Sequence, residues 1–389
     1  MAAHPDAATT AARAIAHDLD ERFFTIVRAY AATGEGPSDV DFDVLAREMF
    51  AYQFACNAPY RAFAISLGIT DPHAITSWQA IPAVPASAFK DATLATFDTV
   101  RRELEFHTSG TTSAQSGKHW IERAALYDAA LLAGFDRFML PDGRKLRYLQ
   151  LVPNPRYKPH SSLGYMMGHV AVLRGDGKAT YFLDDESVDV AGFTKALDLA
   201  IAQKQAVCIA GTAFALVALL DGLATTGRTF AAPAGSRIME TGGFKGRARV
   251  VERAELYASL EAALGIAQHD IVAEYGMTEL VSQFYDTLAS RTSSQRVKAS
   301  VPWLRTLVLD TNGDEVAPGE IGFLRHVDLG NRSSVIAIDT EDRGYATPEG
   351  IILLGRDIDA PLRGCSLDAE HLASQNDPIE AFSFEPEGR

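Results

Sequence analysis

The segment FHTSGTTSAQSGKHW, residues 106–120, concentrates the groups that a phosphate-binding loop needs. Its hydroxyl residues can donate hydrogen bonds to phosphate oxygens, and its glycine lets the backbone approach an anion closely. Lys118 adds a charged donor at the end of the segment. The residues that we expect to contact phosphate are Thr108, Ser109, Gly110, Thr111, Thr112 and Lys118.

This segment is not a Walker A loop. Thr112 stands where that motif has its first glycine, and His119 stands where the magnesium-binding hydroxyl should follow the lysine. A G-x-G-x-x-G dinucleotide motif after a strand and a G-x-S-x-G nucleophile elbow are both missing from the sequence. The sequence therefore gives no support for a Walker-type nucleotide triphosphatase, a dinucleotide-dependent dehydrogenase or a hydrolase with a nucleophile elbow.

A second segment, AEYGMTEL at residues 273–280, follows an apolar run. Tyr275 offers an aromatic face for a base, Thr278 a hydroxyl for an oxyanion, and Glu279 a carboxylate for a hard cation such as magnesium. Gly276 separates the tyrosine from the two polar residues.

These two segments resemble the signatures T-S-G-T-T-G-x-P-K and [YF]-G-x-T-E of the adenylate-forming superfamily. Residues 108–112 match the opening of the first without a gap, but Ser113 replaces the next glycine and no proline precedes Lys118. Lys118 also lies two residues later than the family lysine, so their equivalence stays open. The resemblance implies that Tyr275 stacks on adenine, Thr278 bonds the α-phosphate, and Glu279 helps to hold Mg²⁺.

Two later segments extend the resemblance. IDTEDRGY, residues 338–345, resembles the T-G-D motif with Glu341 in place of glycine, which implies that Asp342 accepts the ribose hydroxyls. LGRDID, residues 354–359, resembles the G-R-x-D hinge motif, and Arg356 would reach the ribose or a phosphate. Either Asp357 or Asp359 could serve as the hinge acid.

The likeness narrows to the acyl-protein synthetase of the bacterial bioluminescence fatty-acid reductase, a branch that lacks the mobile lid and is related to phenylacetate–CoA ligases. The segments NAPYRAF, WQAIPAVPASAFK, HSSLGYMM, ETGGFKGR and LRGCSL carry it from about residue 40 onward. Because the chain ends at Arg389, we expect no full lid domain. In LRGCSL the resemblance implies that Cys365 accepts the acyl group, and a thiol is a strong nucleophile toward an acyl-adenylate.

The implied function is ATP- and Mg²⁺-dependent activation of a carboxylic acid, expected to be a fatty acid, followed by transfer through Cys365 to a partner acyl reductase. Thr241, Gly242 and Gly243 are expected to border the adenine and acyl pocket. Gly211 and Phe214 are expected to line an apolar slot, and His160 is a candidate contact for the substrate carboxylate. One alternative is an acid–CoA ligase, or an acyl-adenylate donor to a carrier protein or amine. Another is a non-catalytic nucleotide-binding scaffold subunit.

Bulk composition limits the alternatives. The chain has 389 residues, a formal charge of −14 and only three cysteines, which lie far apart. The acidic balance argues against nucleic-acid binding, and the absence of any apolar run of membrane-spanning length argues against membrane insertion. The sparse cysteines fit a reducing compartment, so we expect a cytoplasmic protein.

The elements that must position these residues predict an α/β fold. Short apolar runs at 146–153, 207–211 and 270–276 favour strands, and residues 41–58, 122–139 and 250–264 favour helices. We predict a helical region at 1–100, an α/β core binding ATP and acid at 101–300, a small antiparallel β subdomain at 301–360 and a tail at 361–389. The resemblance implies layered αβαβα sheets.

Overall fold

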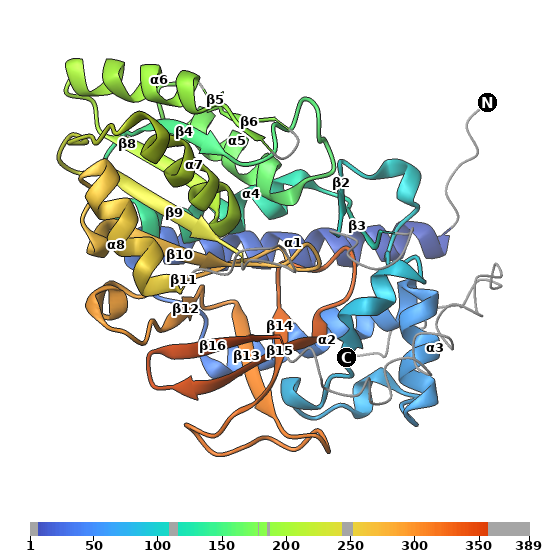
Figure 1. Ribbon diagram of the computed structural model, residues 1–389. Helices are drawn as coiled ribbons and strands as arrows, with labels where there is room; N and C mark the ends of the chain where they lie inside the picture. Colours follow the sequence, from blue (N-terminus) through green and yellow to red (C-terminus); the bar gives the residue numbers. More distant parts are fainter. Residues whose placement is uncertain (1–6, 109–115, 178, 185–186, 243–251, 357–389) are drawn as a thin grey trace, which may run out of the picture.

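The computed structural model describes residues 7–108, 116–177, 179–184, 187–242 and 252–356. Their central feature is one long mixed sheet whose strands follow the order β13-β14-β15-β16-β12-β11-β10-β9-β8-β4-β5. One half of this sheet is parallel and carries helices on both faces, whereas the other half is antiparallel (Figure 1). Within the described residues, no helix combines the length and apolar character needed to cross a membrane.

The parallel half contains the three strands that the sequence predicted. They are β4 (Arg147–Leu151), β8 (Val207–Thr212) and β10 (Ile271–Tyr275), joined by β9 (Arg237–Thr241) and β5 (Ala179–Tyr181). All neighbours in the order β10-β9-β8-β4-β5 run parallel. Their carboxyl ends therefore meet at one edge, where ligands collect in folds of this kind.

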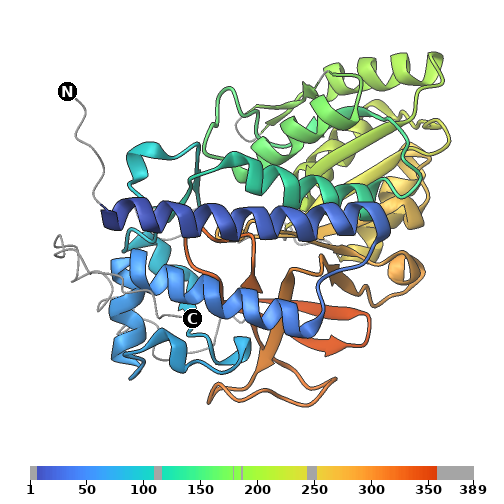
Figure 2. The ribbon, with the colours of Figure 1, turned by 180° about the vertical axis from the view of Figure 1, so that it is seen from behind.

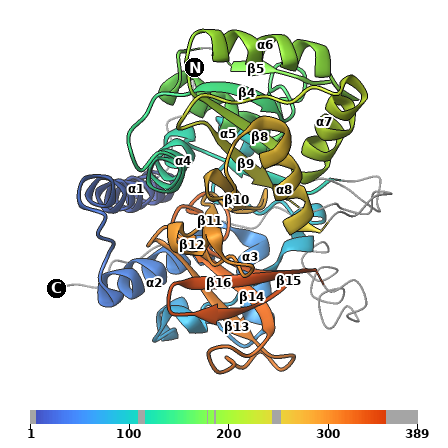
Figure 3. The same ribbon diagram turned by 60° about the vertical axis from the view of Figure 1, so that its left-hand side comes forward.

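Helices cover both faces of the parallel half because its strands are apolar on both sides. Strands β8–β10 lie between one helical layer and another in Figure 3, and each layer has its own hydrophobic cluster. Alternate residues of β8 divide between them: Cys208 packs in one cluster and Ile209 in the other. One layer contains α4 (Ala124–Met139) and α5 (Ser162–Arg174); the other contains α6 (Val190–Ala202), α7 (Ala213–Thr226) and α8 (Arg253–Leu264).

The antiparallel half continues the same sheet through two short strands. Its strands are β11 (Phe284–Asp286), β12 (Lys298–Ser300), β13 (Leu304–Leu309), β14 (Gly322–Asp328), β15 (Ala337–Thr347) and β16 (Gly350–Arg356). A turn at Pro348–Glu349 joins β15 to β16, because Thr347 pairs with Gly350 across it. Strand β1 (Val84–Pro85) adds to β15 in parallel.

The N-terminal part begins with three helices and packs across both halves of the sheet. It comprises α1 (Ala7–Thr33), α2 (Asp39–Cys56) and α3 (Ala58–Ser66), and α1 runs across the face of the molecule that Figure 2 shows. Leu45, Met49, Phe50 and Phe54 of α2 are buried, whereas Val44 is half-buried. Short 3₁₀ turns lie at Pro72–Ala74, Trp78–Ala80, Ala86–Lys90, Thr99–Arg101, Gln268–Asp270 and Leu288–Thr292, and a minor ribbon pairs β6 (Leu183–Asp184) with β7 (Ser187–Val188).

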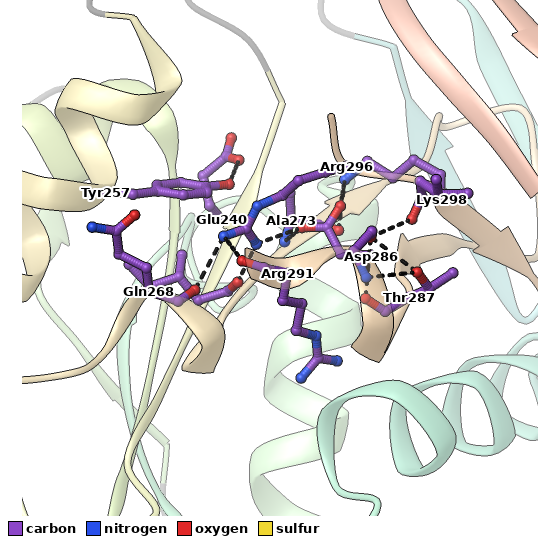
Figure 4. Close-up of polar contacts among 12 residues, drawn as sticks. Glu240, Tyr257, Gln268, Ala273, Asp286, Thr287, Arg291, Arg296 and Lys298 are labelled. Atoms are coloured by element: carbon purple, nitrogen blue, oxygen red, sulfur yellow. Dashed lines mark hydrogen bonds and ion pairs between the residues drawn. The ribbon is translucent and has the colours of Figure 1, made fainter. Parts of the chain in front are cut away.

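A buried charge cluster fastens β10 to β11 and β12. Asp286 accepts hydrogen bonds from the amide of Ala273 at 2.8 Å, from Arg296 Nη1 at 2.9 Å and from Lys298 Nζ at 2.8 Å (Figure 4). Burial alone would raise the pKa of Asp286, but Lys298, Ala273 and Arg296 together hold it below its usual value. We call Asp286, Arg296 and Lys298 the Asp286 cluster.

Candidate active site

The carboxyl ends of β8, β9 and β10 bring together residues that are far apart in sequence. Thr212 pairs with Thr241, and Thr241 in turn pairs with Glu274. The Thr241 hydroxyl donates a hydrogen bond to Glu274. Burial raises the pKa of Glu274 to about 7, although this bond and Lys298 oppose the rise. The sequence did not predict Glu274 as a site residue. Its position next to Tyr275 can be read from the sequence, but its contact with Thr241 cannot.

Two glycines at this edge have a conformation or surroundings that disfavour a larger residue. Gly242 follows β9 with a φ of +68°, which side-chain-bearing residues rarely adopt. Gly276 follows β10, and a Cβ there would lie 2.5 Å from Glu274 Oε1. The backbone can therefore turn tightly at both strand ends. Gly243 lies outside the described residues.

Tyr275 links the parallel half of the sheet to the antiparallel half. Its hydroxyl donates to Asp342 Oδ2 at 2.9 Å and lies 3.1 Å from His326 Nε2. The ring packs on Phe284 and His326, with centroids 5.3 and 5.8 Å away, and only 9% of the residue is exposed. Burial raises the pKa of Tyr275 well above its usual value, so the hydroxyl stays protonated.

Asp342 and Arg356 lie directly opposite each other on β15 and β16. Arg356 Nε lies 3.5 Å from Asp342 Oδ1 and Nη1 lies 4.0 Å from Glu341 Oε2. The Arg356 side chain is 56% exposed, whereas Asp342 is buried. The structure therefore brings together the two residues predicted for the ribose, with the arginine at the surface.

The segment Thr278–Glu279 is held by two neighbouring parts of the chain. Asn331 Nδ2 donates to the carbonyl of Glu279 at 2.9 Å. His119 Nδ1 lies 2.8 Å from the carbonyl of Thr278 and donates to it, because a carbonyl can only accept. Burial lowers the pKa of His119 to about 4, so this imidazole is neutral at pH 7. Glu279 is 8% exposed.

His119 also ties the phosphate-loop segment to this site. It lies on β3 (Lys118–Ile121), which pairs antiparallel with β2 (Leu104–His107). Two hydrogen bonds join the residues at either side of the connecting segment. Thr108 N donates to the carbonyl of Gly117, and Gly117 N donates to Thr108 Oγ1, both at 2.9 Å. Ser109, Gly110, Thr111 and Thr112 lie outside the described residues.

Three basic side chains surround Glu105 at the base of this hairpin. Arg102 Nε lies 2.5 Å from Oε2, while His107 Nε2 and Lys118 Nζ lie 2.8 and 3.7 Å from Oε1. Burial would raise the pKa of Glu105, but these three neighbours lower it. The Lys118 side chain is 47% exposed, so it is accessible to an anion.

His160 is exposed and stacks on His107, with ring centroids 4.1 Å apart and planes 8° apart. Its Nδ1 donates to the carbonyl of Glu105 at 3.0 Å, because that carbonyl can only accept. Glu105, His107 and His160 lie close enough to suggest a metal site. Parallel stacked rings cannot aim two nitrogen lone pairs at one ion, however, and Arg102 and Lys118 already neutralise Glu105.

The two residues predicted to line an acyl slot, Gly211 and Phe214, lie near the end of β8. Gly211 is buried near the end of β8, and a Cβ there would lie 3.0 Å from Leu151 Cβ. Phe214 is half-buried in the first turn of α7, whose N-cap is Thr212. Cys365 lies outside the described residues.

Comparison with known proteins agrees with this architecture. A family model described as acyl-protein synthetase, LuxE, matches residues 32–367. The sequence has no significant match among curated proteins.

Solved structures with a similar fold include 2-hydroxyisobutyryl-CoA ligase in its postadenylation state with 2-HIB-AMP (16% identity, 86% of this chain, 72% of that chain, TM-score 0.62). Its open conformation with 2-HIB-AMP and CoA gives 17% identity, coverage of 83% and 71%, and a TM-score of 0.60. McyG A-PCP with phenylalanyl-adenylate gives 15% identity, coverage of 67% and 48%, and a TM-score of 0.48. The match thus spans about half of the McyG chain.

The 2-hydroxyisobutyryl-CoA ligase comparisons confirm the predicted fold class, that of the N-terminal domain of adenylate-forming enzymes. The family model covers most of the sequence, including all of the strand ends described above. This chain therefore belongs to the LuxE acyl-protein synthetase family.

Proposed function

We propose that this protein activates a carboxylic acid, most simply a fatty acid, by forming acyl-AMP from ATP and releasing pyrophosphate. One observation carries the proposal. Tyr275, Thr278 and Asp342 lie at one edge of the sheet. Thr108 and Gly117, which flank the phosphate-loop segment, lie at the same edge. This arrangement suits a nucleotide, because groups for its base, its α-phosphate and its ribose lie near Thr108 and Gly117, which flank the segment proposed for the outer phosphates.

The reaction needs little covalent chemistry from the protein. A carboxylate oxygen attacks the α-phosphorus, a new O–P bond forms, and the bond to the bridging oxygen breaks as its electron pair leaves with pyrophosphate. Catalysis then depends on alignment and on donors directed at the developing charge. Thr278 would donate to the α-phosphate, and the hydroxyl-rich loop with Lys118 would stabilise the departing pyrophosphate.

Glu279 is the residue that would hold magnesium. It supplies carboxylate oxygens, the ligands that this hard cation prefers, next to the residue proposed for the α-phosphate. The ion, when bound through ATP, would neutralise phosphate charge.

The acyl group is proposed to leave AMP for a thiol. The thiolate of Cys365 would attack the carbonyl carbon, a thioester would form, and AMP would depart with the electrons of the broken bond. A partner acyl reductase would then receive the acyl group. Family membership supports this step, and His160, Gly211, Phe214, Thr241, Gly242 and Gly243 remain our candidates around the acid and the adenylate.

ATP–pyrophosphate exchange with Mg²⁺, across short, long and aromatic carboxylic acids, tests the first step. We expect acid-dependent exchange, and the preferred acid would give the size of the pocket. Glu279→Gln should lower exchange by about 10²-fold or more, because charge stabilisation in a buried site is lost. ATP binding without exchange for any acid would instead favour a scaffold subunit.

Acyl transfer is tested with a radiolabelled acid and ATP. We expect Cys365→Ser to abolish labelled acyl-protein but to leave pyrophosphate exchange intact, whereas Cys56→Ser is the matched control and should keep both. Unchanged labelling in Cys365→Ser would exclude this acceptor. Product formation only with added CoA or a carrier protein would point to the ligase alternative.

A further inference from the structure

A chain of hydrogen bonds leads from the antiparallel half of the sheet into the candidate nucleotide site. Thr306 and His326 face each other on β13 and β14, with Thr306 Oγ1 2.9 Å from His326 Nδ1. His326 Nε2 lies 3.1 Å from the Tyr275 hydroxyl, which lies 2.9 Å from Asp342 Oδ2. We call these four residues the His326 relay.

The direction of each hydrogen bond in the relay follows from its last member. Tyr275 donates its single proton to Asp342, so its oxygen must accept from His326 Nε2–H. His326 Nδ1 then carries a lone pair and accepts from the Thr306 hydroxyl. This assignment requires a neutral imidazole, and burial lowers the pKa of His326 to about 3.

The relay places a constraint on Asp342 that a tyrosine alone would not supply. A phenol hydroxyl can rotate about its C–O bond, but donation from His326 leaves the Tyr275 proton directed at Asp342. Tyr275 belongs to β10 and Asp342 to β15, so the relay also fixes one half of the sheet against the other at the site. His326 itself is fully buried and cannot touch a ligand.

We propose that His326 is a positioning residue of the nucleotide site, which acts through Tyr275 to orient the Asp342 carboxylate toward the ribose hydroxyls of ATP. This inference rests on the proposed function. It adds a buried residue that affects ribose recognition through Tyr275 and Asp342, without contact with the nucleotide.

Isothermal titration with ATP, 2′-deoxy-ATP and 3′-deoxy-ATP tests the proposal on the full chain. The wild-type protein should bind ATP more tightly than either deoxy analogue. His326→Leu should reduce this preference about tenfold, because the carboxylate that reads the hydroxyls loses its orientation. His326→Gln should restore most of the preference, since its amide can replace the Nε2–H donor.

The ratio of affinities separates positioning from a purely structural role. A structural role would weaken binding of all three nucleotides equally and leave the ratio unchanged in folded His326→Leu, which would overturn the inference. If His326→Leu does not fold, Thr306→Val removes only the hydroxyl at Nδ1 and should lower the ratio to a smaller extent; an unchanged ratio there would equally overturn it. No binding of any nucleotide by the wild-type protein would reject the proposed function and this inference together. If the wild-type protein prefers ATP over the deoxy analogues and His326→Leu keeps the same preference, only this inference is rejected and the proposed function stands.

Discussion

Two buried polar clusters lie along strand β10, and they are built differently. At its middle residue, the Asp286 carboxylate is matched by two cations and a backbone amide, and Asp286, Arg296 and Lys298 are all buried. At its end, Asp342 is matched by a neutral hydroxyl and by Arg356, whose side chain is 56% exposed. The first cluster is closed to solvent, whereas the second opens to the surface on one side.

This difference separates a structural carboxylate from one that is suited to a ligand. A buried charge is costly unless every partner is present, so removing one member of a closed cluster leaves the others uncompensated. Asp342 faces a partner that solvent already reaches, and its second oxygen can exchange that partner for a ligand. Both clusters neutralise a carboxylate, but only the cluster with the exposed arginine leaves its carboxylate accessible to a ligand.

The largest expected effect is on stability at the Asp286 cluster. Asp286→Ala should destabilise the protein by about 3–5 kcal/mol, because Arg296 and Lys298 stay buried without their shared partner. Urea denaturation measures this loss. Arg228→Gln, which breaks an exposed ion pair with Asp198, is the control and should leave the midpoint unchanged. A loss of less than about 1 kcal/mol in Asp286→Ala would contradict the closed-cluster description.

The next prediction concerns the open end of β10. Asp342→Asn should weaken ATP binding about 10- to 100-fold, because a charged acceptor of hydrogen bonds becomes a neutral amide. Stability should change by only about 1 kcal/mol, since one oxygen remains for Tyr275. Calorimetric titration and urea denaturation of the same preparation measure both quantities. A stability loss as large as that of Asp286→Ala, with ATP affinity unchanged, would make the two clusters equivalent.

The smallest expected effect is on the pH dependence of stability, which distinguishes His119 from the Asp286 cluster. The pKa of His119 is about 4 in the folded protein, below the ordinary 6.5, so between these values the unfolded chain binds a proton that the folded chain refuses. Stability therefore falls as pH drops through this window, by about 1.4 kcal/mol per unit from this one group. In His119→Asn, which keeps a donor for Thr278, the loss between pH 6.5 and 5 should be about 2 kcal/mol smaller.

The Asp286 cluster should not contribute in that window. Its carboxyl has a lowered pKa, so its stabilisation is complete above the ordinary aspartate value and is lost only at more acidic pH. Glu274 and Asp328 act in the opposite direction to His119. Burial raises their pKa values to about 7 and about 6, so their contribution to stability increases as the pH falls. For that reason the measurement is the difference between variant and wild type. Parallel stability curves for the two proteins from pH 6.5 to 5 would contradict the assignment to His119.

Much of the parallel half could be predicted because its signals are local. The runs around β4, β8 and β10 are apolar and short, and α4 and α8 begin and end within a few residues of the predicted helices. Tyr275, Thr278 and Glu279 could be proposed from one contiguous segment. Such patterns survive without knowledge of the fold, because each depends on neighbours in sequence.

His326 and His119 could not be found in this way. His326 sits in an ordinary strand, and its partner Tyr275 is 51 positions away in sequence. His119 follows Lys118 in the loop segment, yet its bonding partner Thr278 is 159 positions away. Helix and strand periodicities relate only residues that are close in sequence. No sequence pattern could therefore have paired either histidine with its partner.

The sequence by itself determined the α/β character and the residue types available for nucleotide chemistry, because these depend on apolar periodicity and short motifs. Only the tertiary structure decided which carboxylates are closed and which are open. That distinction depends on burial and on partners from other strands: Asp286 and Asp342 are both aspartates in strands, but the sheet surrounds one with buried cations and places the other beside an exposed arginine.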